Sequence, residues 1–175
     1  MNLNIEVAHD SELTPDLKAA ILALCNRAYE EDLTQLFATF ENPTHVLGFQ
    51  IGALVSHAMW VTRWLQPHNG PRLRTAYVEM VATEPDQQGH GFATAVMRRL
   101  ASAISEYDLG ALCPAEPALY SSLGWEFWRG PLFIRSGEGL LATPQERIMF
   151  LRLEKTPLLD PELVISAEWR AGELW

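Results

Sequence analysis

The chain has 175 residues, of which 48% are hydrophobic and 20% charged, and its formal net charge is −9. This composition excludes a disordered chain, and the length fits a single globular domain over residues 1–175. The negative charge argues against a nucleic-acid partner and favours cationic ones, and no apolar run is long enough to span a membrane.

The first half of the chain predicts one strand, one helix, a short apolar segment and a strand pair. Residues 3–7 alternate between apolar and polar and indicate a strand. Thr14 is expected to cap a helix that starts at Pro15 and buries one apolar stripe, Cys25 included. A short apolar segment follows through residue 40, and then strands over residues 45–50 and 53–65.

The second half begins with a dense turn signal over residues 67–71 and the strand that leads to residue 83. Ala93, Met97, Leu100 and Ile104 recur at helical spacing after it. Further elements are expected in chain order: a strand at 110–113, a short helix at 116–123, a strand from 125, a flexible loop at 137–139 and a strand at 147–153. The final stretch holds two tryptophans and is expected to pack back onto the domain with a functional contact.

The turn between the central strand and its helix is a candidate anion site. Pro85 ends the strand, and the run Gln87-Gln88-Gly89-His90-Gly91 opens the helix, whose first N–H groups would point at a phosphate or pyrophosphate. The run lacks the third glycine of a dinucleotide fingerprint and the lysine of a P-loop. From these residues alone, an ordinary tight turn is an equal alternative.

This run, Asp86-Gln87-Gln88-Gly89-His90-Gly91, resembles the acyl-CoA loop of the Gcn5-related N-acetyltransferases. Asp86 departs from the Arg or Gln that usually opens the loop in that family. The resemblance implies that acetyl-CoA binds at the strand end and the loop. The residues concerned are Val81, Ala82, Thr83, Gln88, Gly89, His90, Gly91, Phe92 and Ala93.

A second motif lies where the same family places its catalytic tyrosine. In the run Ala118-Leu119-Tyr120-Ser121-Ser122-Leu123-Gly124-Trp125, residues 119–125 match the Leu-Tyr-x-x-x-Gly-Phe/Trp part of the family pattern Ala-x-x-Leu-Tyr-x-x-x-Gly-Phe/Trp. The resemblance covers nearly the whole chain and implies an α/β fold, with a mixed, strongly bent sheet flanked by helices. It also implies that Tyr120 is the general acid, while a core tyrosine on a short helix is the structural alternative.

The chemistry of acyl transfer to an amine gives the polar residues their roles. An ammonium has no lone pair, so a carboxylate such as Glu79, or a water it orients, must take its proton. Strand alternation would put Glu79 on one face with Tyr77, Val81 and Thr83. The N–H of Val81 is the candidate oxyanion donor, and the backbone of Val81 and Thr83 could pair with the amides of pantetheine. A tyrosine hydroxyl could protonate the leaving thiolate.

A narrower resemblance, to aminoglycoside 2'-N-acetyltransferases, rests on Ala76-Tyr77-Val78-Glu79, on Trp128-x-Gly130-Pro131 and on the final residues 169–175. In those enzymes acidic side chains surround a polycationic sugar. The counterparts here, as substrate-binding residues, are Asp32, Glu79, Cys113, Glu146, Glu173 and Trp175. Phe37 stands where those enzymes have a second early carboxylate, Cys113 replaces a serine and Glu173 replaces an aspartate.

The expected function is therefore acetyl-CoA-dependent N-acetylation of a small cationic amine by direct transfer, with an aminoglycoside 2'-amino group as first candidate and antibiotic resistance as one role. Another amine, such as a polyamine, an amino sugar or a peptide N-terminus, is the alternative, as is a non-catalytic acyl-CoA sensor. No metal is expected, because the five histidines are scattered. Cys113 is expected to be a buried structural thiol rather than an acyl carrier. Residues 1–6 show no signal peptide, which with two cysteines favours a cytoplasmic protein, with a homodimer as one assembly.

Overall fold

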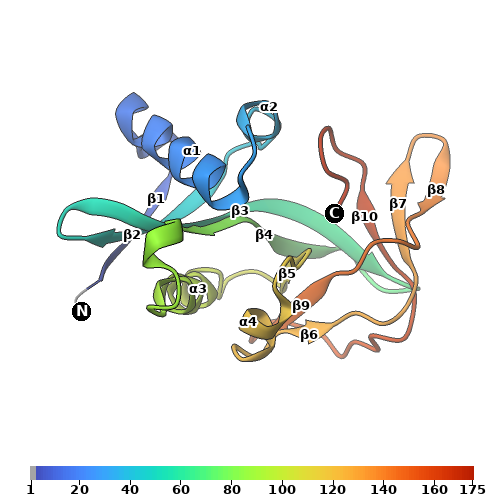
Figure 1. Cartoon of the computed structure of the whole chain (residues 1–175). Helices are drawn as coiled ribbons and strands as arrows, with labels where there is room; N and C mark the ends of the chain where they lie inside the picture. Colours follow the sequence, from blue (N-terminus) through green and yellow to red (C-terminus); the bar gives the residue numbers. More distant parts are fainter. Residues whose placement is uncertain (1–2) are drawn as a thin grey trace. The chain divides into compact units, whose positions relative to one another are not determined.

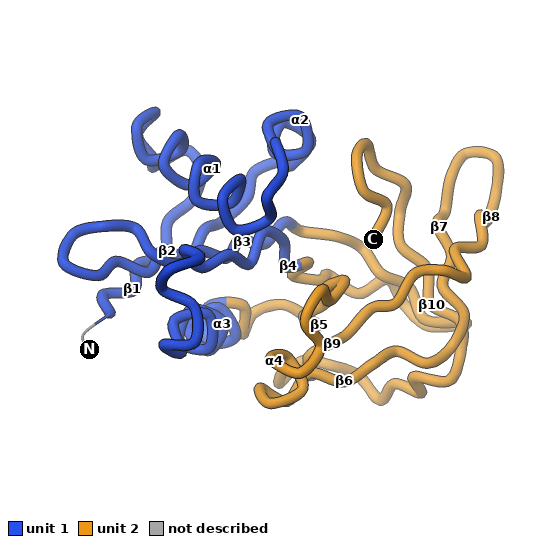
Figure 2. Tube along the Cα trace, viewed as in Figure 1, with its two compact units in different colours: residues 1–61, 78–103 blue, residues 62–77, 104–175 orange. Residues whose placement is uncertain are grey.

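A computed structural model describes residues 3–175 of the chain, so Met1 and Asn2, which belong to the segment considered for a signal peptide, lie outside the described residues. All four α-helices of the described residues lie in the part of the chain before β6 (Glu126–Phe127), and the elements from β6 onward are strands (Figure 1). The chain divides into two compact units, one of residues 1–61 and 78–103 and the other of residues 62–77 and 104–175 (Figure 2). Strands β3 (Ala53–Pro67) and β4 (Leu73–Thr83) each run through both units.

Unit 1 starts with strand β1 (Asn4–His9) and helix α1 (Pro15–Tyr29). The predicted cap is present: the Thr14 hydroxyl accepts a hydrogen bond from the N–H of Leu17 at 3.3 Å. Ile21, Leu24 and Cys25 are buried, as the apolar stripe predicted. The short helix α2 (Thr34–Phe37) and strand β2 (Thr44–Gln50) follow, and β2 pairs antiparallel with both β1 and β3.

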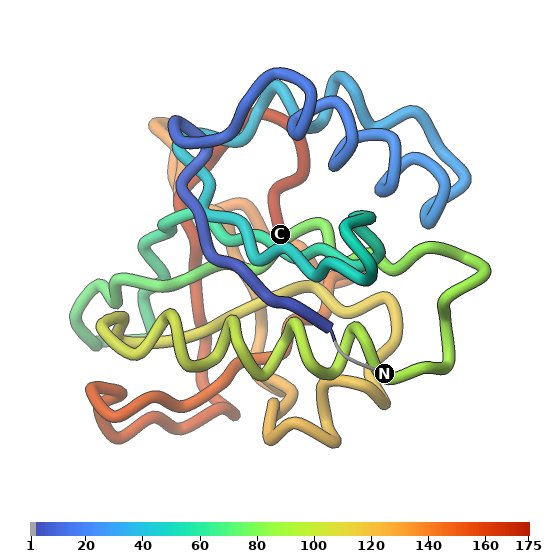
Figure 3. Tube along the Cα trace, turned by 90° about the vertical axis from the view of Figure 1, so that its left-hand side faces the viewer, coloured from blue at the N-terminus to red at the C-terminus, as the bar shows by residue number. Residues whose placement is uncertain are grey.

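Helices cover both faces of the sheet in unit 1. Helices α1 and α2 lie on one face and α3 (Phe92–Ala103) lies on the other, along β1 and β2 (Figures 1 and 3). The packing of α3 is close, since a Cβ atom on Gly48 of β2 would lie 3.1 Å from the side chain of Val96. Phe92, Val96, Met97 and Leu100 form the buried stripe of α3, whereas Ala93 is only half-buried. A core under α1 joins Leu13, Ile21, Leu24, Cys25, Leu33, Leu47, Met59, Met80 and Ala82.

Unit 2 combines parallel and antiparallel strand pairs. The first part of β4 pairs parallel with β5 (Leu109–Leu112), and β9 (Met149–Arg152) pairs antiparallel with β5 and with the short strand β6 (Glu126–Phe127). Helix α4 (Pro117–Ser121) carries the predicted tyrosine motif and ends before Gly124, whose φ of 86° suits glycine. The mixed pairing and the helices confirm the expected α/β class.

The sequence analysis missed three strands of unit 2. Strands β7 (Leu132–Ser136) and β8 (Gly139–Ala142) form an antiparallel hairpin, so the segment 137–139 is its turn and not a free loop. Strand β10 (Ile165–Glu168) lies in the final stretch, parallel to β7 and antiparallel to the end of β3. Across residues 3–175, no helix combines the length and the apolar character that a membrane crossing requires.

Candidate active site

The candidate acyl-CoA loop of unit 1 has the backbone that its glycines predicted. Strand β4 ends at Thr83, a single 3-10 turn (Pro85–Gln87) follows, and α3 begins at Phe92. Gly89 and Gly91 have φ angles of 78° and 80°, and a side chain at either would meet no atom within 4 Å. The space beside both glycines is therefore open, so an acyl-CoA pyrophosphate could approach the first N–H groups of α3 there.

Side chains around the loop do not supply the positive charge that a phosphate would favour. Gln88 and His90 are exposed, and the imidazole of His90 lies 3.1 Å from the carbonyl oxygen of Gln87. Asp86 is exposed as well, whereas the carboxylate of Glu84 forms a two-point ion pair with Arg27 of α1. The backbone amides are thus the groups with which this loop can bind an anion. The ion pair with Arg27 neutralises the charge of Glu84 but not that of Asp86.

Strand β4 is irregular at Met80, next to the predicted base. Met80 is in the left-handed region, with φ of 53°, in a strand that is otherwise extended. A left-handed residue interrupts the regular alternation of side chains, and this interruption falls between Tyr77 and Glu79 on one side and Val81 and Thr83 on the other. Glu79 itself is 8% exposed. Irregularities of this kind re-aim backbone groups beside active sites.

Side chains from α1 and β3 fix the backbone carbonyls of this part of β4. The ring nitrogen Nδ1 of His57 lies 2.9 Å from the carbonyl oxygen of Met80, and the hydroxyl of Tyr29 donates to that of Val81 at 3.2 Å. The hydroxyl of Ser56 donates to the carbonyl of Ala82 at 3.1 Å and lies 2.9 Å from the hydroxyl of Thr83. The sequence analysis named none of these partners. The adjacent polar residues Ser56 and His57 within an apolar strand were the available signal.

Tyr120 of unit 2 is buried, with 7% of its surface exposed, and its ring meets Trp125 edge-on. Burial, then the nearby Cys113 and Glu116, raises the pKa of Tyr120 to about 12. The phenol is therefore protonated at neutral pH and can donate a hydrogen bond. Cys113 is exposed, so the expectation of a buried structural thiol is wrong for Cys113, whereas Cys25 is buried as predicted. β5 ends at Leu112, one residue before the thiol.

The final residues of unit 2 are packed. Trp175 is 3% exposed, and its indole N–H donates to the hydroxyl of Thr143 at 2.8 Å. The backbone N–H of Glu146 donates to the carbonyl of the same Thr143, at 3.1 Å. Thr143 therefore links two of the predicted substrate-binding residues. Glu173, by contrast, is exposed.

A buried arginine holds this C-terminal segment. Arg63 is 1% exposed and donates to the carbonyls of Leu174 and Glu168, both at 2.8 Å. Its guanidinium lies 4.8 Å from the ring centre of Tyr77 and 5.9 Å from that of Trp175. The Nε of Arg63 also donates to the carboxylate of Glu168, at 3.4 Å. Three charge-assisted hydrogen bonds and two aromatic faces thus satisfy this buried guanidinium.

The predicted site residues therefore fall into two groups. Unit 1 carries Asp32, Glu79, the end of β4 and the glycine loop, and unit 2 carries Cys113, Tyr120, Glu146, Glu173 and Trp175. Asp32 is exposed and accepts hydrogen bonds from the N–H and the hydroxyl of Thr34, which lower the pKa of its carboxyl. Within residues 3–175, no three or more His, Cys, Asp or Glu side chains gather as a metal ion would require.

Comparisons with known proteins identify the family of this chain. A family model described as "Acetyltransferase (GNAT) domain" matches residues 11–128. The aminoglycoside 2'-N-acetyltransferase of Mycolicibacterium fortuitum is 31% identical over 97% of this chain and 90% of that protein.

Two solved structures share the fold. YhbS from Escherichia coli, a GNAT-family N-acetyltransferase in complex with CoA, superposes with a TM-score of 0.65 at 17% identity over 95% of this chain and 89% of that one. Eis1 from Mycobacterium abscessus superposes with a TM-score of 0.62 at 20% identity over 74% of this chain. This chain covers 32% of the Eis1 chain, so that likeness concerns a part of the larger protein.

Proposed function

Because this chain belongs to the Gcn5-related N-acetyltransferase (GNAT) family, we propose that it transfers the acetyl group of acetyl-CoA directly to an amino group of a small polycationic substrate. The first candidate is the 2'-amino group of an aminoglycoside, which would make antibiotic resistance one of its roles. The observation that carries this proposal is the near full-length likeness to the Mycolicibacterium fortuitum enzyme. A net charge of −9 suits a substrate with several ammonium groups.

In this proposal the acetyl-CoA pyrophosphate lies on the backbone amides between Gly89 and Ala93, and pantetheine follows the end of β4. The open space above Gly89 and Gly91 supports the placement. The carbonyl of Val81 already accepts from Tyr29, but a carbonyl oxygen has two lone pairs and can accept again. His90 and Gln88, on the exposed rim, would contact the phosphates.

Glu79 takes a proton from the substrate ammonium, directly or through one water, so that the neutral amine attacks the thioester carbonyl, and the N–H of Val81 binds the oxyanion. The left-handed backbone at Met80 supports this second role, because it separates the direction of the Val81 amide from the regular ladder. Tyr120 donates a hydrogen bond to the departing thiolate. The pKa of Tyr120, about 12, lies well above the roughly 8.5 of a thiol. Tyr120 therefore keeps its proton and stabilises the thiolate mainly by donating a hydrogen bond.

The proposed substrate-binding residues are Asp32 of unit 1 and, in unit 2, Glu146, Glu173 and the Trp175 carboxylate, with Cys113 at the position that relatives fill with serine. Phe37 stands where relatives have a second early carboxylate. The substrate site would therefore have one carboxylate fewer to pair with the ammonium groups of the substrate.

We further propose that one acetyltransferase domain spans residues 1–175, that the enzyme works in the cytoplasm without a metal, a membrane or nucleic acid, and that it forms a homodimer. Size-exclusion chromatography with light scattering tests the last point.

The test is acetylation of matched aminoglycosides that carry an amino or a hydroxyl group at the 2' carbon, read by mass spectrometry of the product. Acetylation of the 2'-amino members alone supports the proposal. Equal acetylation of both members, or acetylation of polyamines and amino sugars instead, would refute the 2' assignment and keep the reaction class. Glu79→Gln should lower kcat by about 100-fold or more without changing acetyl-CoA binding, and an unchanged kcat would remove Glu79 from its role.

A further inference from the structure

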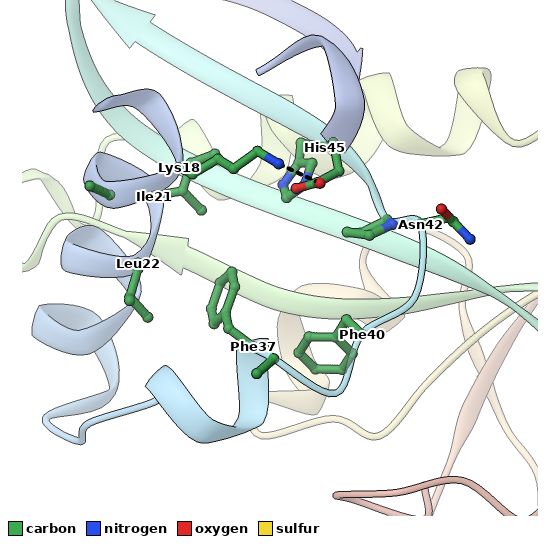
Figure 4. Close-up of a pocket in the computed structure, with 11 residues that line it drawn as sticks. Lys18, Ile21, Leu22, Phe37, Phe40, Asn42 and His45 are labelled. Atoms are coloured by element: carbon green, nitrogen blue, oxygen red, sulfur yellow. Dashed lines mark hydrogen bonds and ion pairs between the residues drawn. The ribbon is translucent and has the colours of Figure 1, made fainter. Parts of the chain in front are cut away.

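Unit 1 contains a cavity that none of the predicted site residues lines. It has a volume of about 400 Å³ and lies between α1, α2 and the start of β2 (Figure 4). This is within the range of small-molecule sites. The lining residues are Asp10, Lys18, Ala19, Ile21, Leu22, Phe37, Ala38, Phe40, Asn42, Pro43 and His45.

Most of this cavity wall is apolar. Phe37 and Phe40 meet edge-on with ring centres 6.0 Å apart, and Leu22 and Ile21 of α1 face them across the cavity (Figure 4). Phe37 is the residue that replaces an acidic side chain of the aminoglycoside-modifying relatives. An aromatic ring or a branched alkyl group fits such a wall.

The polar end of the cavity holds an unsatisfied buried acceptor. His45 is 3% exposed, and its Nε2 atom has no hydrogen-bond partner. Oδ1 of Asp10 lies 3.6 Å from it, within ion-pair distance but beyond hydrogen-bond distance, while the other carboxylate oxygen of Asp10 binds Lys18 at 2.5 Å. An unsatisfied buried polar atom is costly, so this nitrogen favours a partner.

The hydrogen-bond chain behind His45 determines which kind of group can bind to Nε2 of His45. The carbonyl of Met80 can only accept, so Nδ1 of His57 carries a hydrogen and its Nε2 is bare. Nε2 of His57 lies 2.9 Å from Nδ1 of His45, which must therefore donate. Burial lowers the pKa values of His45 and His57 to about 4 and about 3, so both rings are neutral at pH 7. Nε2 of His45 is thus a bare lone pair, beside a second acceptor on Asp10.

We propose that this cavity is a second binding site, for a small molecule that carries an amino group on an aromatic or aliphatic body. Two N–H groups of one amino head can reach the acceptors of His45 and Asp10, which lie 3.6 Å apart, while the body packs on Phe37 and Phe40. An anionic head has no hydrogen to donate, so the site rejects it.

The chain from His45 through His57 to the carbonyl of Met80 couples this site to the strand between Glu79 and Val81. A ligand that binds His45 polarises both imidazoles and strengthens the hydrogen bond that holds the left-handed residue. The ligand therefore changes the rate of acetyl transfer. This coupling, unlike the binding itself, rests on the proposed function.

The binding test uses phenethylamine, with phenylacetate as a probe of the same body and an acceptor-only head, and no acetyl-CoA. Two hydrogen bonds, one to the buried nitrogen of His45 and one to the partly exposed carboxylate of Asp10, predict that phenethylamine binds about tenfold more tightly by calorimetry. In ¹⁵N NMR spectra of histidine-labelled protein, the resonance of the bare His45 nitrogen should move with phenethylamine only. Equal binding of both probes, or no movement at His45, overturns the proposal and leaves a cavity that holds water only.

Two matched variants locate the site. Ala19 lines the cavity and Ala20 is its exposed neighbour on α1, so Ala19→Phe should abolish the His45 response and Ala20→Phe should retain it. With acetyl-CoA and an accepted amine, phenethylamine should alter turnover in the wild type and in Ala20→Phe but not in Ala19→Phe. Binding at His45 without turnover of any amine would refute the proposed function but not the second site. An equal His45 response in both variants would refute the second site.

Discussion

Replacing Arg63 by Met should release the C-terminal segment of unit 2 while the rest of that unit stays folded. The change removes the donors that satisfy the carbonyls of Leu174 and Glu168, and the cation between the rings of Tyr77 and Trp175. A hydrogen bond from a charged donor contributes about 1.5 to 3 kcal/mol. The lower value applies because Leu174 and Glu168 are only partly buried, so two bonds contribute about 3 kcal/mol.

This free energy corresponds to a rise of about 150-fold in the population with the segment detached. Hydrogen exchange measured by mass spectrometry reads this population directly, over peptides that cover residues 165–175. Global unfolding should also move, with a fall in Tm of roughly 6–12 °C for a chain of this size. Arg63→Lys keeps the charge but cannot reach both carbonyls, so it should show about half of the effect.

Arg98→Met, on the exposed face of α3, is the control and should change neither readout. If exchange over residues 165–175 in Arg63→Met equals that of the control, the two carbonyls are satisfied in another way and the reasoning fails. The variant should also raise the KM for the amine and leave that for acetyl-CoA unchanged, because the detached segment carries Glu173 and Trp175. Equal changes in both KM values would mean that the segment is structural only.

Three further predictions follow from the burial of single groups. Tyr120→Phe should lower kcat by about 10-fold to 100-fold and spare acetyl-CoA binding; unchanged turnover would remove its role. Cys113 should react with iodoacetamide in the folded protein, whereas Cys25, whose pKa burial raises to about 12, should react only after unfolding, as peptide mapping would show. His45 and His57 have lower pKa values folded than unfolded, so the unfolded chain takes up protons first as the pH falls. Each should therefore remove about 2 kcal/mol of stability between pH 7 and pH 5, and a flat urea midpoint over that range would contradict this.

Local sequence patterns predicted the parts of the fold that local physics determines. Thr14-Pro15 marked the start of α1, and Pro85 with Gly89 and Gly91 marked the turn between β4 and α3, because cap, proline and glycine effects act over a few residues. The two motifs that carry the family resemblance lie on such local features. They could be read without any knowledge of tertiary contacts.

The features that escaped prediction depend on distant partners. Nothing in a methionine within an apolar strand signals a left-handed conformation, and Met80 is held there by the side chain of His57. The β7–β8 hairpin presents Leu140 and Leu141 to solvent, so it lacks the alternation that marks a strand. Cys113 follows a buried strand directly, and only the structure shows that the chain reaches the surface there.

Strand β10 has a consequence for how unit 2 folds. It pairs with β3 on one side and with β7 on the other, and Ile165 lies opposite both Pro67 and Leu132. The sequence separation is about a hundred residues for the first pair and about thirty for the second. Contacts between residues so far apart in the sequence form slowly, because the conformational entropy of a large loop must be lost before the contacts stabilise the fold. During synthesis, β3 and β7 leave the ribosome well before their common neighbour. Until β10 has been synthesised, each presents an unpaired edge that another chain could occupy, so the nascent protein is prone to aggregation during this interval.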